Sequence, residues 1–400
     1  MKLLARLAIG LSLMVTTTAH ADTVTQTVYE GTIGKSPVVV ELRSATVKGK
    51  TVHTGQYYYK RYRTLIALEP GSGPLTFNER PGCGDMGPDC PITGALALKS
   101  LPTGLSGLWT AKGKKTSAPV VLKTIATRTL TSSLRIGQTS DLYAVDDTLN
   151  GGTGELARND PFRARRVNQD SVYGPEVRVG PIAYQTVTDK VTGVHYLQLT
   201  QHPVESVRDK VNAALDVERF YRVESALDCL SQSGFPGTGT TGGFEEMTDK
   251  VVYLSPTIMA VESAGSTFCG GAHPNNSWTI TMYDLKKGGY LSADQLLALY
   301  VTPPGWAPGD ERPETPAFKA LKARLTPKSP WFVGDRSIPE CLADDLGYDY
   351  QTSFNDKGLV FSRSDLPHVM GACMGEYYVV PYAELKALWR PEAKTYFSGL

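Results

Sequence analysis

The feature that most constrains the fold is the strand-and-turn pattern of residues 22–125, which has almost no helical periodicity. Val38–Leu42 is a β-branched run, Gly55–Leu68 is a long alternating run, and Ala118–Leu122 is a short apolar one. Glycine and proline residues separate these runs, as is usual for strands joined by turns. The pattern predicts an all-β antiparallel meander or small barrel over residues 22–128.

The N-terminal segment, residues 1–21, is typical of a cleaved export signal. Two basic residues precede the apolar stretch Leu7–Val15, and Ala19–Ala21 is a small-residue cleavage site. We therefore predict cleavage after Ala21 and a periplasmic location. No later stretch reaches the roughly 18 apolar residues of a membrane helix, so we expect no membrane span.

All six cysteines follow that segment. An even number of cysteines in an oxidising compartment favours disulfides, and their clustering along the chain suggests local pairs. The expected pairs are Cys83–Cys90, Cys229–Cys269 and Cys341–Cys373. The absence of a C-x-x-C motif disfavours redox catalysis. A zinc site is the alternative, but the cysteine spacings do not match a structural zinc module, so we expect no metal and no cofactor.

Length and charge exclude further classes of protein. The chain has 400 residues, of which 41% are hydrophobic, which is enough for two domains with their own cores. Its 41 Lys and Arg residues nearly balance 40 Asp and Glu residues, so there is no overall charge that favours nucleic acid.

Residues 129–173 form the expected linker. The glycines of 151–154 interrupt regular structure, and four arginines follow on a polar stretch. These are Arg158, Arg163, Arg165 and Arg166. A solvated linker is the favoured interpretation, and binding of an anionic glycan or lipid is the alternative.

After residue 173 the pattern becomes mixed. Val194–Leu199 has the composition of a strand, and Pro203–Leu227 has apolar residues at helical spacing. Further strands are expected at Val251–Val261, Trp278–Tyr283, Gly358–Phe361 and Tyr377–Val380. Helices and strands do not alternate regularly, so we predict an α+β domain over residues 174–400, with an antiparallel sheet packed by helices.

This second region resembles a known family. The motif residues are Cys269-Gly270-Gly271-Ala272-His273-Pro274-Asn275, Tyr283-Asp284-Leu285, Gly288, Leu291–Leu296, Gly358–Phe361 and Tyr378–Leu385. They are similar to the extracytoplasmic domain of RsiV-type anti-sigma factors, which also occurs as the accessory domain of PdaC-type peptidoglycan deacetylases. The resemblance covers about residues 180 to 390.

The resemblance implies an α+β domain that binds lysozyme or other partners associated with the cell wall. Two differences from this family limit the properties that the resemblance implies for this chain. The chain has neither the transmembrane segment nor the cytoplasmic part of the anti-sigma factors. It also has no polysaccharide deacetylase domain, so no catalytic activity is implied.

The Gly-Gly-Ala-His turn is the first candidate binding site. Its glycines, Gly270 and Gly271, permit backbone conformations that could present His273 and Asn275 to a partner. A structural role for His273 in holding the turn is the favoured alternative. Catalysis is disfavoured because no nucleophile or catalytic motif is visible nearby. The other histidines, His53, His195, His202 and His368, are scattered without metal-ligand spacing and receive no role.

A second candidate is the strand that runs through Tyr57, Tyr59, Arg61 and Arg63. Period-2 alternation would place these four side chains on one face, where tyrosine rings and guanidinium groups can stack on sugars or bind acidic groups. An ordinary half-exposed sheet face is the favoured alternative.

Together these observations predict a non-enzymatic periplasmic binding protein of the cell envelope. Its expected partner is a lysozyme-type muramidase or a peptidoglycan fragment, and not nucleic acid. One alternative is a cell-wall hydrolase with an unrecognised active site. Another is a binder of small apolar ligands inside the N-terminal β domain, which would require an open internal cavity.

Overall fold

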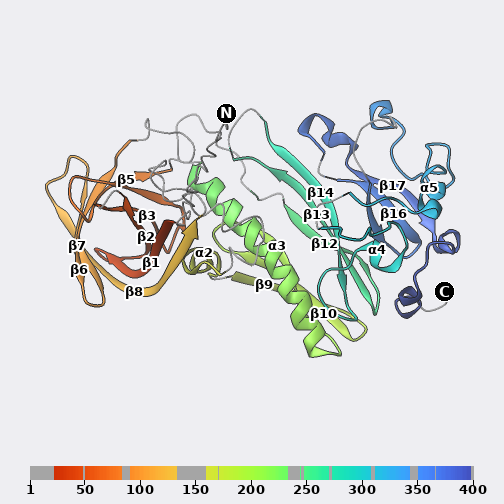
Figure 1. The fold of residues 1–400 in the computed structure, drawn as a ribbon, viewed down its shortest axis with the longest axis horizontal. Coiled ribbons are helices and arrows are strands. Elements are labelled where there is room, and N and C mark those ends of the chain that lie inside the picture. The colour runs from red at the N-terminus through yellow and green to blue at the C-terminus, as the bar shows by residue number, and fades with distance from the viewer. Residues whose placement is uncertain are drawn as a thin grey trace, which may run out of the picture.

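The computed structural model describes residues 22–47, 50–82, 91–132, 159–169, 171–232, 244, 247–269, 273–307, 311–342, 350–364 and 366–397. Several residues named above lie outside these ranges, namely the export segment 1–21, Cys83, Cys90, Arg158, Gly270 and Gly271. Figure 1 shows a barrel at one end of the molecule, a long helix in the middle and further sheets at the other end.

The first part of the chain forms a closed antiparallel barrel of eight strands, each paired with the next. The strands are β1 Asp22–Ile33, β2 Ser36–Val47, β3 Lys50–Tyr59, β4 Ile66–Pro70, β5 Thr76–Pro81, β6 Gly94–Leu101, β7 Gly104–Ala111 and β8 Ser117–Ser132. Pairing of β1 with β8 along the whole of β1 closes the barrel. The predicted antiparallel β region is confirmed, and closure leaves no unpaired strand edge.

Inward-facing side chains fill the barrel. All eight strands contribute to one buried apolar cluster, which includes Val40, Phe77 and Leu122. A buried carboxylate, Glu79, accepts hydrogen bonds from Tyr57 Oη at 2.7 Å, from Trp109 Nε1 at 2.5 Å, and from a threonine hydroxyl. These side chains form the core of the barrel.

The alternating run Gly55–Leu68 predicts one continuous strand, and this prediction is wrong. Strand β3 ends at Tyr59, and the chain turns before β4 begins at Ile66. The backbone N–H groups of Tyr62 and Arg63 both donate to the Tyr59 carbonyl, and Arg63 takes a φ of 57°. The alternation therefore stops, and the four residues predicted to share one face do not share it.

The described arginines of the expected linker differ in exposure: Arg166 is buried, Arg163 is half-buried and Arg165 is exposed. Residues 161–167 form helix α2, Pro161–Val167, whose first turn is capped by the Asp160 side chain. Each described arginine pairs with an acid of another element: Arg163 with Glu224, Arg165 with Glu30 and Arg166 with Asp228. Sequence spacing could not identify these partners because they lie far away along the chain. Phe162 packs on the outer barrel face against Tyr58, so α2 joins the barrel to the rest of the molecule.

Three antiparallel sheets of three strands each follow. Their strands are β9 Ser171–Val179, β10 Ile182–Asp189 and β11 His195–Gln201; β12 Thr248–Leu254, β13 Ile258–Thr267 and β14 Asn275–Asp284; and β15 Gln351–Phe354, β16 Gly358–Arg363 and β17 Gly375–Pro381. The expected single strand Val251–Val261 is the hairpin β12–β13, which turns near Pro256. The antiparallel pairing agrees with the prediction.

The long helix α3, Glu205–Gln232, lies between the first two sheets in sequence and packs on both. Its residues Val207, Val211 and Leu215 enter a core with Leu199 of β11 and Val261 of β13. These are the helical apolar positions identified in the sequence, and the helix extends past the predicted end by one further turn and a half, on the roughly 3.6 residues per turn of an α-helix.

Short helices complete the fold: α4 Ala293–Leu296, α5 Pro316–Lys322 and the 3₁₀ helices Pro339–Leu342, His368–Cys373, Tyr382–Leu385 and Pro391–Thr395. Helix α5 is capped by Thr315, whose hydroxyl accepts from the Phe318 N–H at 3.2 Å. No helix in the described ranges is both long enough and apolar enough to cross a membrane.

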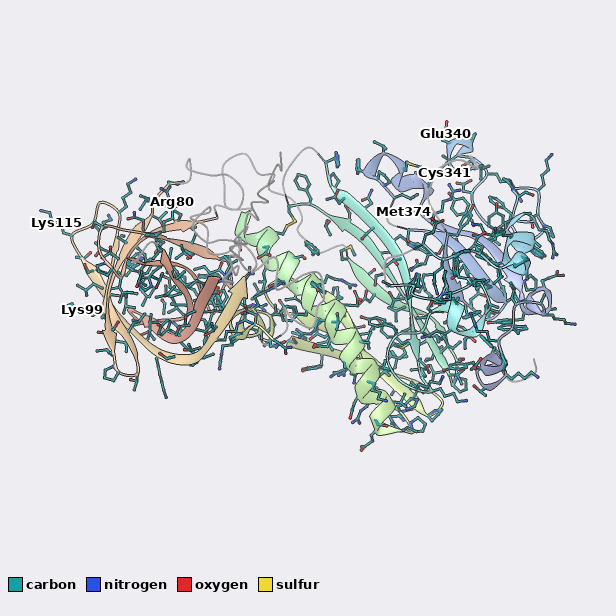
Figure 2. The ribbon with its side chains drawn as sticks, in the orientation of Figure 1. Arg80, Lys99, Lys115, Glu340, Cys341 and Met374 are labelled. Atoms are coloured by element: carbon teal, nitrogen blue, oxygen red, sulfur yellow. A yellow bond between two sulfur atoms is a disulfide. The ribbon has the colours of Figure 1, made fainter. Side chains whose placement is uncertain are left out.

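Two disulfides join these elements in the pairing expected from the sequence. Cys229 on the last turns of α3 bonds to Cys269, just after β13. Cys341 bonds to Cys373 and so joins two 3₁₀ helices in the part of the molecule farthest from the barrel (Figure 2).

Candidate functional site

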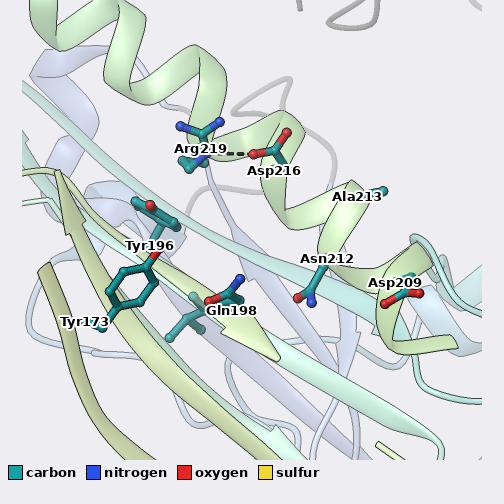
Figure 3. A pocket seen from close by; sticks show the side chains of 9 residues that line it. Tyr173, Tyr196, Gln198, Asp209, Asn212, Ala213, Asp216 and Arg219 are labelled. Carbon is teal, nitrogen blue, oxygen red and sulfur yellow. Dashed lines mark hydrogen bonds and ion pairs between the residues drawn. The ribbon is translucent and has the colours of Figure 1, made fainter. Parts of the chain in front are cut away.

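The candidate site is a hollow of about 330 Å³ between helix α3 and the sheet β9–β10–β11 (Figure 3). It is lined by Tyr173, Tyr196, Leu197, Gln198, Asp209, Asn212, Ala213, Asp216 and Arg219. Most of these side chains are aromatic or polar. The hollow is therefore suited to a ligand with both hydroxyl groups and apolar surfaces.

Strand alternation supplies one wall. Leu197 and Leu199 of β11 belong to the core beneath α3, so Tyr196 and Gln198 point to the opposite face. The Gln198 side chain accepts a hydrogen bond at 3.0 Å from the amide of Gln185 on β10. Tyr173 comes from the far strand, β9, and is aligned with Tyr196 through a shared partner on β10.

Helical spacing supplies the other wall. Asp209, Asn212, Asp216 and Arg219 recur at intervals of three or four residues and so share one face of α3. Asn212 fixes this face against β11, because its amide group accepts from the Leu199 N–H at 2.8 Å and donates to the Leu199 carbonyl at 2.9 Å. Asn212 thus holds helix α3 against strand β11.

Arg219 organises the aromatic end of the hollow. Its guanidinium lies 5.5 Å from the centre of the Tyr196 ring and donates to Asp216 Oδ1 at 2.7 Å. A second nitrogen donates to Asn168 Oδ1 at 2.5 Å, just beyond helix α2. These contacts hold the Tyr196 ring in one orientation.

The two tyrosines differ in their exposure. Burial raises the pKa of Tyr196, whose hydroxyl is 3.1 Å from Ser171 Oγ, so the phenol is neutral at physiological pH. Tyr173 is 62% exposed. Figure 3 shows the two rings next to each other at the mouth of the hollow. Together they form an aromatic surface that is open to solvent on one side.

The lining residues do not form a recognisable catalytic set. They include no histidine, cysteine, serine or lysine, so a nucleophile with a neighbouring base is absent from this lining. Asp209 and Asp216 are seven residues apart, about 10 Å along the helix axis. The carboxyl groups of glycosidases lie about 5–9.5 Å apart, and Asp216 is already paired with Arg219. Among the described residues no cluster of His, Cys, Asp and Glu could hold a metal ion.

His273, the described residue of the Gly-Gly-Ala-His motif, is not part of this lining. His273 is exposed, and its ring stacks on that of His368 with centroids 3.8 Å apart. Its Nδ1 is 3.1 Å from the carbonyl oxygen of Pro274. Asn275 is the exposed first residue of β14. The structure thus adds His368, which received no role in the sequence analysis, to this candidate.

The second candidate does not form a surface. Tyr57 and Arg63 are completely buried, and Tyr59 is half-buried with its ring 5.5 Å from that of Tyr57. Arg61 is exposed, but it lies in the turn after β3. The prediction that these four residues share an accessible face is wrong because Tyr57 points into the barrel and Arg63 pairs with Asp189.

Sequence reasoning missed the hollow, although both of its walls carried a signal. Tyr196 and Gln198 alternate with leucines in a run that was correctly identified as a strand. The polar face of α3 is the complement of the apolar positions that identified the helix. What the sequence could not indicate is that these two faces meet, together with Tyr173 from a third element.

Comparison with known proteins adds no assignment. Neither a scan against protein-family models nor a search of curated proteins finds a match for this chain. The resemblance to RsiV-type domains therefore stays a prediction.

Proposed function

We propose that this protein is a non-enzymatic binding protein of the cell envelope, and that its hollow between α3 and β11 holds a sugar segment of a wall glycan. The observation that carries this proposal is the pair of tyrosine rings at the mouth of a hollow lined by carboxylate, amide and guanidinium groups. Sugars present apolar C–H faces that stack on aromatic rings, and hydroxyl groups that bond to such polar side chains.

The size of the hollow agrees with this ligand class. About 330 Å³ lies at the lower end of the range of small-molecule sites and suits one or two sugar rings. Tyr173, which is 62% exposed, offers its ring to a sugar that enters from solvent. Amino sugars of peptidoglycan are the preferred candidates since the amide of Gln198 and the carboxylate of Asp209 offer both donor and acceptor groups.

The export expected from residues 1–21 supports the same proposal. The two disulfides are of the kind that persists in oxidising compartments, where wall glycans are found. A hydrolase is a weaker alternative, because Asp216, one of the two carboxylates in the lining, is already paired with Arg219.

The test is titration of the purified protein with soluble muropeptides and with chitobiose, monitored by calorimetry. We expect saturable binding that falls about fivefold in Tyr173→Ala, because a stacking ring contributes about 1 kcal/mol. Tyr62→Ala is the matched control, since Tyr62 is 54% exposed but lies at the barrel. Equal loss in both variants, or no binding by the unmodified protein, would refute the proposal.

A second candidate function is recognition of a lysozyme-type muramidase, as the family resemblance implies. The supporting observation is the exposed His273, whose ring is held in place by stacking on His368. A fixed and exposed imidazole ring, which offers both an aromatic face and hydrogen-bonding nitrogens, is a suitable contact for a protein partner.

Binding to immobilised lysozyme tests this second function separately. We expect His273→Ala to weaken binding and His202→Ala, far from that turn in the sequence, to leave it unchanged. Failure to bind lysozyme while muropeptides still bind would reject the muramidase candidate and leave the glycan proposal intact.

A further inference from the structure

One part of the barrel has an excess of positive charge. Residues 91–127 contain five lysines and no aspartate or glutamate. These lysines are Lys99, Lys112, Lys114, Lys115 and Lys123, and all five are exposed. In the part of the chain that the structure describes, none of them is paired with a carboxylate. The near-neutral total charge of the protein therefore hides a local excess of positive charge.

The strand register shows how these lysines are distributed. Lys99 on β6 is opposite Ser106 on β7, which is in turn opposite Val121 on β8. Lys123 is in the next row, opposite Gly104. The other three lysines are in or beside the turn between β7 and β8. The cations thus flank both ends of one outer face, which we call the β6–β8 face.

Apolar side chains occupy the same face between the lysines. Leu101, Leu108 and Val121 are 48%, 51% and 60% exposed. They point outward because their neighbours along the strands, such as Leu105 and Leu122, point into the barrel core. Leu108 lies opposite Ala97 of β6 and Pro119 of β8 in the strand register. Because these two neighbours are small and apolar, the surface around Leu108 is apolar.

We propose that the β6–β8 face docks on a membrane surface that carries anionic lipid headgroups. Exposed aliphatic side chains ringed by lysines are the combination that binds the interface of an anionic bilayer, where lysine attracts headgroups and leucine enters the acyl boundary. An anionic polysaccharide would match the lysines alone, since it offers no apolar interior for Leu108 and Val121.

This surface is independent of the hollow at α3. The strands β6 and β7 lie on the side of the barrel away from α3 (Figure 1), and Lys99 and Lys115 project from that outer side (Figure 2). Docking of the β6–β8 face would leave the tyrosines of the hollow accessible. The protein could therefore hold a glycan while it rests on a membrane.

The test is co-sedimentation of the purified protein with vesicles. We expect binding to vesicles of phosphatidylglycerol and phosphatidylcholine, no binding to phosphatidylcholine alone, and weaker binding as salt is raised. The triple variant Lys112→Gln, Lys114→Gln and Lys115→Gln should bind about a hundredfold more weakly, since each lysine near an anionic surface contributes about one kcal/mol.

Two further variants separate the membrane from other partners. Leu108→Ser with Val121→Ser should also weaken vesicle binding while the far-ultraviolet circular dichroism stays unchanged. The charge-matched control, Lys319→Gln, Lys328→Gln and Lys386→Gln, should leave binding unchanged. If the serine variant binds as well as the unmodified protein, or if the control loses as much as the barrel triple, docking on a membrane is refuted.

Discussion

The most exacting prediction concerns Arg63, which joins the barrel to the following elements. Its side chain is completely buried and forms an ion pair with Asp189, itself 2% exposed. It also donates to the carbonyl oxygens of Arg166 at 3.1 Å and Val167 at 3.3 Å. Arg63→Met would keep much of the volume but remove all three interactions.

The expected cost follows from the groups that are left behind. Loss of one partner of a buried ion pair costs about 3–5 kcal/mol, because the other charge stays buried without compensation. The lower end applies here, since Asp189 Oδ1 keeps three donors from Val191 and Thr192, at 2.9–3.1 Å. We therefore expect the free energy of unfolding to fall by about 3 kcal/mol. At a typical slope of about 2 kcal/mol per molar urea, this lowers the urea midpoint by about 1.5 M.

Urea unfolding followed by circular dichroism and tryptophan fluorescence provides the measurement. Arg61→Met, in the same turn but exposed, should change the unfolding free energy by no more than about 0.5 kcal/mol. The double variant Arg63→Met with Asp189→Asn should be more stable than Arg63→Met alone, because it also removes the unpaired buried charge of the Asp189 carboxylate. A midpoint for Arg63→Met equal to that of Arg61→Met would refute the reasoning.

Three further predictions concern stability. Replacing Cys229 and Cys269 by serine should cost about 4 kcal/mol, from the entropy of a loop spanning 40 residues, measured by urea unfolding of each form. Gly31→Ala should lower the melting temperature, because a Cβ there would sit 1.9 Å from a carbonyl oxygen of β8; an unchanged melting temperature in calorimetry would contradict this close approach. The hydrogen bond from Lys60 lowers the pKa of Glu30, so its stabilising contribution is present above pH about 4.3 and lost as the pH falls further. Urea midpoints of Glu30→Gln should thus be lower than those of the unmodified protein at pH 7, and the difference should shrink as the pH falls through the lowered pKa of Glu30.

Much of the local structure could be predicted from the sequence. The alternation around Val38–Leu42, the helical spacing of Val207, Val211 and Leu215, and the cap at Thr315 each involve neighbours within a few residues. Two cysteine pairs were predicted for the same reason, since their partners are close in the sequence. Such features depend on local geometry, which a short stretch of sequence determines by itself.

The errors came from contacts between distant segments. Alternation suggested that the strand through Tyr57 would continue to Leu68, but Arg63 leaves it to pair with Asp189, 126 residues later. The ion pairs of the α2 arginines cannot be predicted from the sequence, because their acidic partners, Glu30, Glu224 and Asp228, lie on the barrel and on α3. A charge pattern in the sequence shows which groups are present, but not which opposite charge will be within reach.

The candidate site is also formed by contacts between distant segments of the chain. Strand alternation places Tyr196 and Gln198 on one strand face, and helical spacing places Asp209, Asn212 and Asp216 on one helix face. That these faces meet depends on tertiary packing, since the two hydrogen bonds of Asn212 to Leu199 hold the helix beside the strand. Local periodicity specifies the faces of each element, whereas packing of elements against a common core decides which faces lie together.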